Sequence, residues 1–354
     1  MLVVGTVATF FSAQPLGPWV PGSLLAGLDN FLLPLAVMLI IRTFDADSVE
    51  FTLRRATLVL LLGMSANAIL SVLQSQGVMA SYLRPFWSSS ASASTVAERA
   101  ETMGRFSGLF NQPAEAGLAY SLALILGVWY LSGTQRRIWC MCLLLLLLVG
   151  GVLTVSKVFV FLGVPLALVY VIIGKDLSTR TRILISTSLT ISVLIVSSLN
   201  VAANWAGFEY FARLFRGPDS DVLSFYTAGR WNSGSGMLSV VQWVLGDSPF
   251  IGYGWAGISV AYDSAWTEII VVSGLLGLGC LVVVLALLTS MALRNQNQST
   301  RVLMILVVSL TIGATFGLPA LTANRVATWI WVIIGLLVEA AVIRPQLEPE
   351  QFES

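Results

Sequence analysis

The chain has 354 residues, 56% of them hydrophobic and 10% charged, and its formal net charge is +1. Soluble domains carry about 25% charged residues, so this composition excludes an ordinary soluble enzyme and predicts an integral membrane protein. Long apolar runs favour helices over a β-barrel, whose strands alternate only weakly, and the near-zero net charge gives no reason to expect nucleic acid.

Apolar runs divide the chain into ten candidate spans, which predict an all-α polytopic membrane bundle. In chain order they cover residues 1–12, 24–41, 55–76, 114–131, 138–153, 157–173, 183–201, 264–290, 302–317 and 326–343. Several are shorter than the roughly 20 residues that a straight span needs. The first lacks a basic stretch and is expected to be a short span rather than a signal peptide. Segment 237–245 is too short to cross, so we expect it at the interface or re-entering the membrane.

The basic residues predict which side of the membrane each connection faces. Eleven of the nineteen lysines and arginines lie in short connections, and this enrichment marks the cytoplasmic side. They are Arg42, Arg54, Arg55, Arg136, Arg137, Lys175, Arg180, Arg182, Arg294, Arg301 and Arg344. Both termini then face the cytoplasm, and two long polar stretches, 77–113 and 202–263, face outward. We expect one transmembrane domain over 1–343, with its major outer loop near the C-terminal third, and a disordered cytoplasmic tail over 344–354.

The first outer stretch ends in GRFSGLFNQPAEAG (104–117), which puts Arg105 where a loop meets a span. Pro113 is expected in the first turn of the following helix. Amides at a helix N-terminus together with an arginine form an anion site. The alternative is that Arg105 only anchors the span at the interface.

A second cation, Lys157, lies in LTVSKVFVFLG (153–163), within the shortest outer turn. A single cation between two spans is costly unless it is paired or faces a cavity. Anion binding and simple extension of the side chain toward the interface both remain open for this residue.

The major outer loop supplies Arg213, Arg216 and Arg230. Guanidinium groups suit a diphosphate because they form paired hydrogen bonds with its oxygens. Arg230, between a glycine and a tryptophan in TAGRWNSG, is the leading candidate. Arg213 and Arg216 could equally be solvated or contact lipid headgroups.

The same loop continues into SPFIGYGWAGIS, where Tyr253 and Trp255 stand among glycines. Aromatic faces on a flexible backbone suit stacking against a sugar ring. An aromatic belt at the membrane interface is the alternative interpretation.

Two carboxylates follow at the end of the loop, Asp263 and Glu268. Acidic groups close to membrane depth are functional candidates by default, and either could act as a general base. An ion pair with a nearby arginine is the alternative. The chain has no histidine, which removes the most common general base and metal ligand. We expect neither a cofactor nor a metal.

Four motifs, taken in order, resemble those of the O-antigen ligase and O-antigen polymerase superfamily of bacterial polysaccharide enzymes. They are GRFSGLFNQP before a span, TVSK in a tight outer turn, AGRW in the large outer loop, and FIGYG followed by YDSAWTEIIVVSGLLG. The resemblance covers residues 100–290 and implies a GT-C-like fold of many spans with one dominant periplasmic loop. It also implies transfer of a glycan from undecaprenyl diphosphate to a sugar hydroxyl. Arg105 and Arg230 would hold the diphosphate, and Lys157 stands where an arginine is often found.

One departure separates the branches of that superfamily. The ligase branch typically carries His-Asn eleven residues before the first glycine of a G-x-x-G pair. Here the pair is Gly274 and Gly277, and the corresponding positions hold Asp263 and Ser264. The absence of the ligase's proposed base favours a Wzy-like polymerase of lipid-linked repeat units.

The resemblance also implies a setting. We expect a multi-pass protein of the bacterial cytoplasmic (inner) membrane. Its expected partners are undecaprenyl-diphosphate-linked oligosaccharide, the lipid bilayer, and flippase and chain-length regulator proteins. A ligase-type transferase with another acceptor is one alternative. A secondary transporter or flippase is another, although transporters tend to show paired half-helices and repeated halves that are not obvious here.

Overall fold

The computed structural model describes residues 2–11, 21–87, 95–132, 137–174, 177–179, 182–183, 185–187, 191, 206–213, 222–227, 229–257, 262–322 and 324–347. All regular elements among them are helices. Five helices are long and apolar enough to cross a membrane, and they cover Ser48–Ser75, Pro113–Ser132, Ala265–Arg294, Gln298–Thr315 and Arg325–Val342. The prediction of a helical membrane protein is confirmed at this level. Ten spans and a GT-C-like arrangement stay predictions.

The chain divides into two compact units. We call Met1–Asp45, Pro218–Arg294 and Thr311–Ser354 the terminal unit, and Ala46–Gly217 with Asn295–Leu310 the central unit. Each unit is described by itself. The single transmembrane domain expected over 1–343 stays a prediction.

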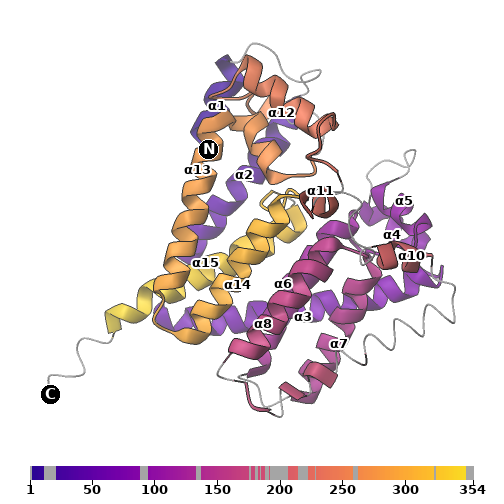
Figure 1. Cartoon of the computed structure of the whole chain (residues 1–354). Coiled ribbons are helices and arrows are strands. Elements are labelled where there is room, and N and C mark those ends of the chain that lie inside the picture. Colours follow the sequence, from indigo (N-terminus) through magenta and orange to yellow (C-terminus); the bar gives the residue numbers. More distant parts are fainter. Residues whose placement is uncertain are drawn as a thin grey trace. The chain divides into compact units, whose positions relative to one another are not determined.

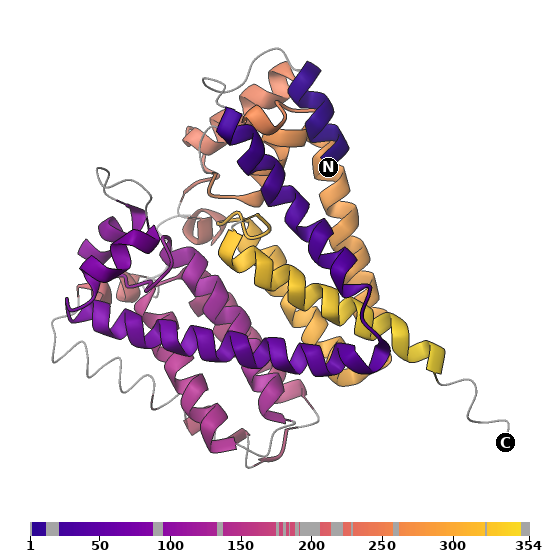
Figure 2. The same cartoon turned by 180° about the vertical axis from the view of Figure 1, so that it is seen from behind.

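The central unit is built on three long helices, α3 (Ala46–Ser75), α6 (Pro113–Ser132) and α7 (Arg137–Leu153). All three pack against one another, and α6 also packs against α8 (Val164–Ile173). Figure 2 shows α3 running across α6 and α7. α6 is buried along almost its whole length, because its sequence is apolar on every side.

Shorter elements complete the central unit. They are α4 (Ala80–Trp87), α5 (Val96–Thr102), the π-helical turn η1 (Phe159–Gly163) and α10 (Gly207–Arg213). α5 begins at a capping box, in which the Thr95 side chain accepts from the Glu98 N–H and the Glu98 carboxylate accepts from the Thr95 N–H at 2.7 Å. α14 (Gln298–Thr315) begins in this unit, and its last turn belongs to the terminal unit.

The terminal unit is organised around α13 (Ala265–Arg294). α1 (Leu2–Phe11), α12 (Gly236–Asp247) and α15 (Asn324–Leu347) pack against α13, and α2 (Pro21–Ile41) packs against α15. Figure 1 shows indigo α1 beside orange α13. The single-turn helix η2 (Trp255–Gly257) contacts α1, α2 and α13, and α11 (Val222–Thr227) is a further short helix.

α13 is broken inside the span that was predicted as continuous over 264–290. Gly274 has φ 57° and ψ −153°, a combination essentially confined to glycine. A Cβ at this position would lie 2.5 Å from the carbonyl carbon of Phe250. A loop enters the break and replaces the helical hydrogen bonds: Tyr253 N to Val271 O (2.7 Å), Gly254 N to Val272 O (3.0 Å), Leu275 N to Pro249 O (2.8 Å) and Leu276 N to Phe250 O (3.1 Å). The FIGYG motif therefore fills a gap in a helix.

The observed helices follow the predicted apolar runs closely. α6 covers Pro113–Ser132 against the predicted 114–131. α3 instead begins at Ala46, before the predicted 55, and its first turns include an exposed ion pair of 3.2 Å between Arg54 and Glu50. The expected interfacial segment 237–245 lies within α12, and residues 344–347 of the expected tail continue α15. The predicted span 183–201 lies mostly outside the described residues.

Candidate functional site

An arginine and an aspartate of the expected outer loop, 202–263, come together in the terminal unit. Arg230 Nε lies 3.1 Å from Asp263 Oδ2. The two side chains are 34% and 52% exposed, so the pair is open to solvent. Arg230 Nη1 also donates to the carbonyl of Gly317 at 3.4 Å. Of the two alternatives for Asp263 left open by the sequence, the ion pair with an arginine is present.

The end of α14 explains why Arg230 lies there. The last carbonyls of a helix have no partner inside it and form the negative end of its dipole. Four side chains donate to carbonyls at or just beyond this end: Tyr226 to Gly313 (3.2 Å), Ser264 to Thr315 (3.1 Å), Trp231 to Phe316 (3.1 Å) and Arg230 to Gly317 (3.4 Å). The AGRW motif and the start of α13 are thus both attached to the same helix end.

Glu268 lies one turn into α13 and is 5% exposed. The hydroxyl of Thr322, which is also 5% exposed, donates to its Oε2. Thr322 is a residue that sequence reasoning missed; it follows a proline and an apolar stretch between two spans, and nothing in that pattern indicates a carboxylate partner. Glu268 and Asp263 therefore have different environments, one enclosed and one open.

Tyr253 and Trp255 are both covered by protein. Tyr253 is 1% exposed, and its hydroxyl donates to Asp247 at 2.8 Å. Burial, followed by the nearby Asp247 carboxylate, raises the pKa of Tyr253 to about 12. Trp255 is 2% exposed, and its ring lies 5.1 Å from that of Phe31. Stacking of a sugar on these rings stays a prediction, and in this structure both rings have packing roles.

A second cluster lies in the central unit, where two predicted motifs meet. Arg105 Nε donates to the carbonyl of Thr154 at 3.2 Å, and the Phe106 N–H donates to Leu153 at 2.9 Å. The turn between α7 and η1 thereby fixes the direction of the Arg105 side chain. Lys157 is half-buried at the start of the helical stretch that leads through η1 into α8.

The TVSK turn holds an unusual backbone conformation. Val155 has φ 47°, which is rare for a β-branched residue, and it is 5% exposed. Its neighbour Ser156 packs so closely on α6 that a Cβ at Gly117 would lie 2.2 Å from the serine Cβ. The Ser156 hydroxyl is buried without a hydrogen-bond partner. A backbone conformation of this kind costs about 1–3 kcal/mol, and the choice of the turn as part of a site stays a prediction.

Two of the predicted arginines cannot be assigned to either cluster. Arg213 is the last residue of α10 in the central unit, and its side chain is outside the described part. Arg216 lies outside the described residues altogether. Both assignments stay predictions. The structure brings Arg230 together with Asp263 in the terminal unit and Arg105 to the TVSK turn, which bears Lys157, in the central unit.

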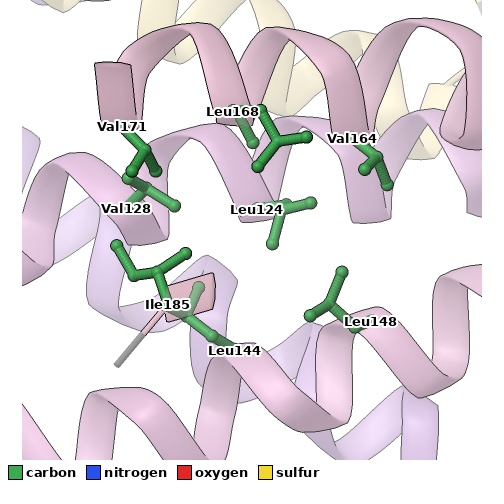
Figure 3. Close-up of a pocket in the computed structure, with 9 residues that line it drawn as sticks. Leu124, Val128, Leu144, Leu148, Val164, Leu168, Val171 and Ile185 are labelled. Atoms are coloured by element: carbon green, nitrogen blue, oxygen red, sulfur yellow. The ribbon is translucent and has the colours of Figure 1, made fainter. Parts of the chain in front are cut away.

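The cavities differ in size and contact with these clusters. A cavity of about 20 Å³ in the central unit is walled by aliphatic side chains of α6, α7 and α8 and by Ile185, and it offers no polar group (Figure 3). Apolar voids of this size stay dry. A larger cavity of about 380 Å³ in the terminal unit is lined mostly by apolar residues, including Phe31, Met38 and Trp331. Thr322, the partner of Glu268, also lines it.

No group of three or more His, Cys, Asp or Glu side chains gathers at metal-binding distance in the described ranges. The apolar helices of the described residues define a helical membrane protein, in which Arg230 pairs with Asp263 in the terminal unit and Arg105 contacts the TVSK turn in the central unit. Comparison of the chain with protein-family models, curated proteins and solved structures finds no match.

Proposed function

We propose that the chain is a metal-independent glycosyltransferase of the bacterial cytoplasmic membrane that polymerises lipid-linked polysaccharide repeat units. The observation that carries the proposal is the pair of Arg230 and Asp263, at 3.1 Å and open to solvent. A cation suited to a diphosphate and a carboxylate suited to a proton lie side by side at the outer end of a candidate span. The expected topology, with ten spans and both termini in the cytoplasm, belongs to this proposal.

The proposed reaction is a substitution at an anomeric carbon. A sugar hydroxyl of one lipid-linked unit attacks the anomeric carbon of another, and a new glycosidic C–O bond forms. The bond from that carbon to the diphosphate oxygen breaks, and undecaprenyl diphosphate leaves with the electron pair. Guanidinium groups stabilise the charge that develops on the leaving group. The hydroxyl proton passes to a carboxylate.

Asp263 is the better candidate for the proton acceptor. Its side chain is 52% exposed, so an acceptor hydroxyl can reach it. Glu268 is enclosed and bound to Thr322, which suits a role in fixing the segment after α14. Approach of a diphosphate to Arg230 would exchange one anionic partner for another and release Asp263 for the hydroxyl.

The large apolar cavity supports a lipid substrate. Its walls, which include Leu35, Leu281 and Val284, offer hydrocarbon surface for part of an isoprenoid chain. Thr322 links this cavity to the carboxylate of Glu268. In the central unit, Arg105 contacts the strained TVSK turn that bears Lys157, and both residues are proposed to bind phosphate groups of a lipid-linked substrate.

A second candidate function, a secondary transporter, is favoured by the break in α13. Broken spans with a buried acidic residue are typical of transporter binding sites. Against it, the loop over Pro249–Gly254 donates to or accepts from four main-chain groups at the break. These groups are therefore already hydrogen-bonded and do not face a solute. Loss of solute uptake with unchanged surface glycan in a deletion strain would favour the transporter.

The test uses a deletion strain complemented with the wild-type chain, Arg230→Ala or Arg105→Ala. We expect both variants to insert in the membrane but to leave single repeat units on the surface acceptor in place of polymer. Polymer that accumulates on the lipid carrier would point instead to a ligase. Normal polymer length in both variants would overturn the proposed function.

A further inference from the structure

Polar side chains interrupt the apolar surface of α3 on one face. Asn67, Ser71 and Gln74 are spaced four and three residues apart, so they lie above one another along the helix. All three are buried, with at most 2% exposed. Amides buried in an apolar helix are costly unless they form hydrogen bonds. Their partners therefore indicate why they are there.

Asn67 uses both ends of its side-chain amide. Its Nδ2 donates to the carbonyl of Ser107 at 3.2 Å and to the Tyr120 hydroxyl at 2.9 Å. Its Oδ1 accepts from the N–H of Leu109 at 2.8 Å. The amide thus binds two main-chain groups of the GRFSGLF motif and one side chain of α6.

Gln74 and Trp87 hold the peptide groups of the residue in between. Gln74 Oε1 accepts from the N–H of Gly108 at 3.1 Å, and Trp87 Nε1 donates to its carbonyl at 2.8 Å. Over Ser107–Leu109, four main-chain groups are therefore bound by side chains from α3 and α4. We call these three residues, Asn67, Gln74 and Trp87, the amide clamp, although Trp87 contributes an indole N–H and not an amide.

The peptide groups that the amide clamp holds, Ser107–Leu109, follow closely after Arg105 in the chain. On the other side, two N–H groups of the motif bind carbonyls outside it. The Phe106 N–H donates to Leu153, and the Arg105 N–H donates to Ala100 at 2.9 Å. The segment that bears Arg105 is thus fixed from both directions, and its guanidinium is directed by Thr154. A loop without a regular ladder of its own becomes rigid in this way.

We infer that Asn67 and Gln74 are positioning residues for an anion site at Arg105, an assignment that rests on the proposed function of that arginine. Both bind main-chain groups of the loop, and Asn67 also donates to Tyr120 and Gln74 to Glu101 at 3.5 Å. They act by holding the Arg105 segment in the geometry that receives a phosphate. Misplacement of a binding group by about 1 Å can lower activity by about 100-fold. Hence an apolar residue at either position weakens phosphate binding although no phosphate contact is removed.

The experiment measures binding of undecaprenyl diphosphate to the purified full chain in nanodiscs. We expect Arg105→Ala and Asn67→Leu each to weaken binding by about tenfold or more. In the double variant the two effects should not multiply, because Asn67 acts only through Arg105. A thermal unfolding scan of every variant reports the stability separately, and Gln74→Leu replaces Asn67→Leu if the latter does not fold.

A matched control comes from the same helix. Thr57 is fully buried on α3, and its hydroxyl has no hydrogen-bond partner. Thr57→Val is therefore expected to leave both binding and stability unchanged. If any polar-to-apolar change in α3 weakened binding, Thr57→Val would weaken it too.

The outcomes separate the two proposals. Wild-type affinity in a folded Asn67→Leu variant, or effects of Asn67→Leu and Arg105→Ala that multiply in the double variant, would overturn the positioning role while the function of Arg105 stands. If Arg105→Ala binds as tightly as the wild type, the anion site itself is refuted, and the positioning role with it. Weakened binding in both single variants, without further loss in the double variant, supports both.

Discussion

The two candidate clusters hold their arginines by different means. In the terminal unit Arg230 is paired with a carboxylate that is half exposed to solvent. The same arginine also donates to a carbonyl beyond α14. In the central unit Arg105 donates to a main-chain carbonyl of a tight turn, and its own loop is bound by buried amides. An exposed ion pair is weak and can exchange its partner for a phosphate. A guanidinium directed by the main chain keeps its geometry. In the proposed reaction, the terminal cluster is suited to exchange its anionic partner, and the central cluster is suited to rigid binding.

Two left-handed backbone positions, one in each unit, are tolerated in different ways. The break in α13 uses Gly274, which adopts φ 57° without steric cost from a side chain. The TVSK turn uses Val155 at φ 47°, where a β-branched side chain is strained. The break in α13 therefore avoids strain by its choice of residue, whereas the TVSK turn retains it beside Arg105. Variants at Gly274 and Val155 test this contrast, and variants at Asp263 and Glu268 test the open ion pair.

The largest effect is expected at Gly274. Gly274→Ala would require a backbone conformation that alanine avoids and would push a Cβ to 2.5 Å from the Phe250 carbonyl carbon. We expect the free energy of unfolding to fall by at least about 3 kcal/mol, the combined cost of a disfavoured backbone and overpacking. Thermal unfolding in detergent measures this loss.

Gly279 in the same helix provides the control. A Cβ there would meet nothing within 4 Å, and Gly279 has no left-handed φ. Gly279→Ala is expected to be neutral or to raise stability by up to about 1 kcal/mol, because alanine favours the helix. Equal stability of the two variants would contradict the close packing of the FIGYG loop in the break of α13.

Much of the helical fold could be predicted from the sequence, because apolar runs of span length leave few alternatives. The run over 114–131 became α6 almost residue for residue. The break at Gly274 could not be predicted, since its cause is a loop from residues 249–254 that enters the helix. The same loop explains why FIGYG has glycines, because a Cβ added at Gly252 would lie 2.5 Å from the carbonyl oxygen of Val271.

The candidate site was predictable only in part, for the same physical reason. Charged residues in an apolar chain stand out singly, so Arg105, Arg230 and Asp263 could be selected from the sequence. Their partners are mostly main-chain carbonyls, which carry no sequence signal. The amide clamp did leave a signal, the spacing of Asn67 and Gln74 on one face of an apolar run. A search for polar residues at helical spacing inside spans would have found it.

An intermediate effect is expected from the two carboxylates of the terminal unit. Asp263→Asn removes an accessible proton acceptor and the anionic partner of Arg230, so polymer formation should fall by about 100-fold, the usual range for loss of a general base. Glu268→Gln keeps an oxygen that accepts from Thr322 and should lower the rate less than about tenfold. Initial rates with lipid-linked repeat units, at equal amounts of folded protein, measure both.

The reverse order, with Glu268→Gln the more damaging variant at unchanged stability, would assign proton transfer to the enclosed carboxylate. The terminal cluster would then not be the open, exchangeable site that its exposure indicates. Asp263→Glu serves as the control, because it keeps the charge and moves it by one methylene.

The smallest effect concerns the strain at Val155. Val155→Ala removes buried methyl groups from the cluster with Phe106, Val149 and Leu153 and keeps an unfavourable φ. Val155→Gly removes slightly more side chain but relieves strain of about 1 kcal/mol or more. Glycine is elsewhere less stabilising than alanine, by about 0.5–1 kcal/mol in regular structure. At Val155 we expect the opposite, with Val155→Gly at least as stable as Val155→Ala in thermal unfolding. If alanine is the more stable replacement, the turn does not hold a left-handed residue, and the contrast between the strained TVSK turn and the relaxed break in α13 fails.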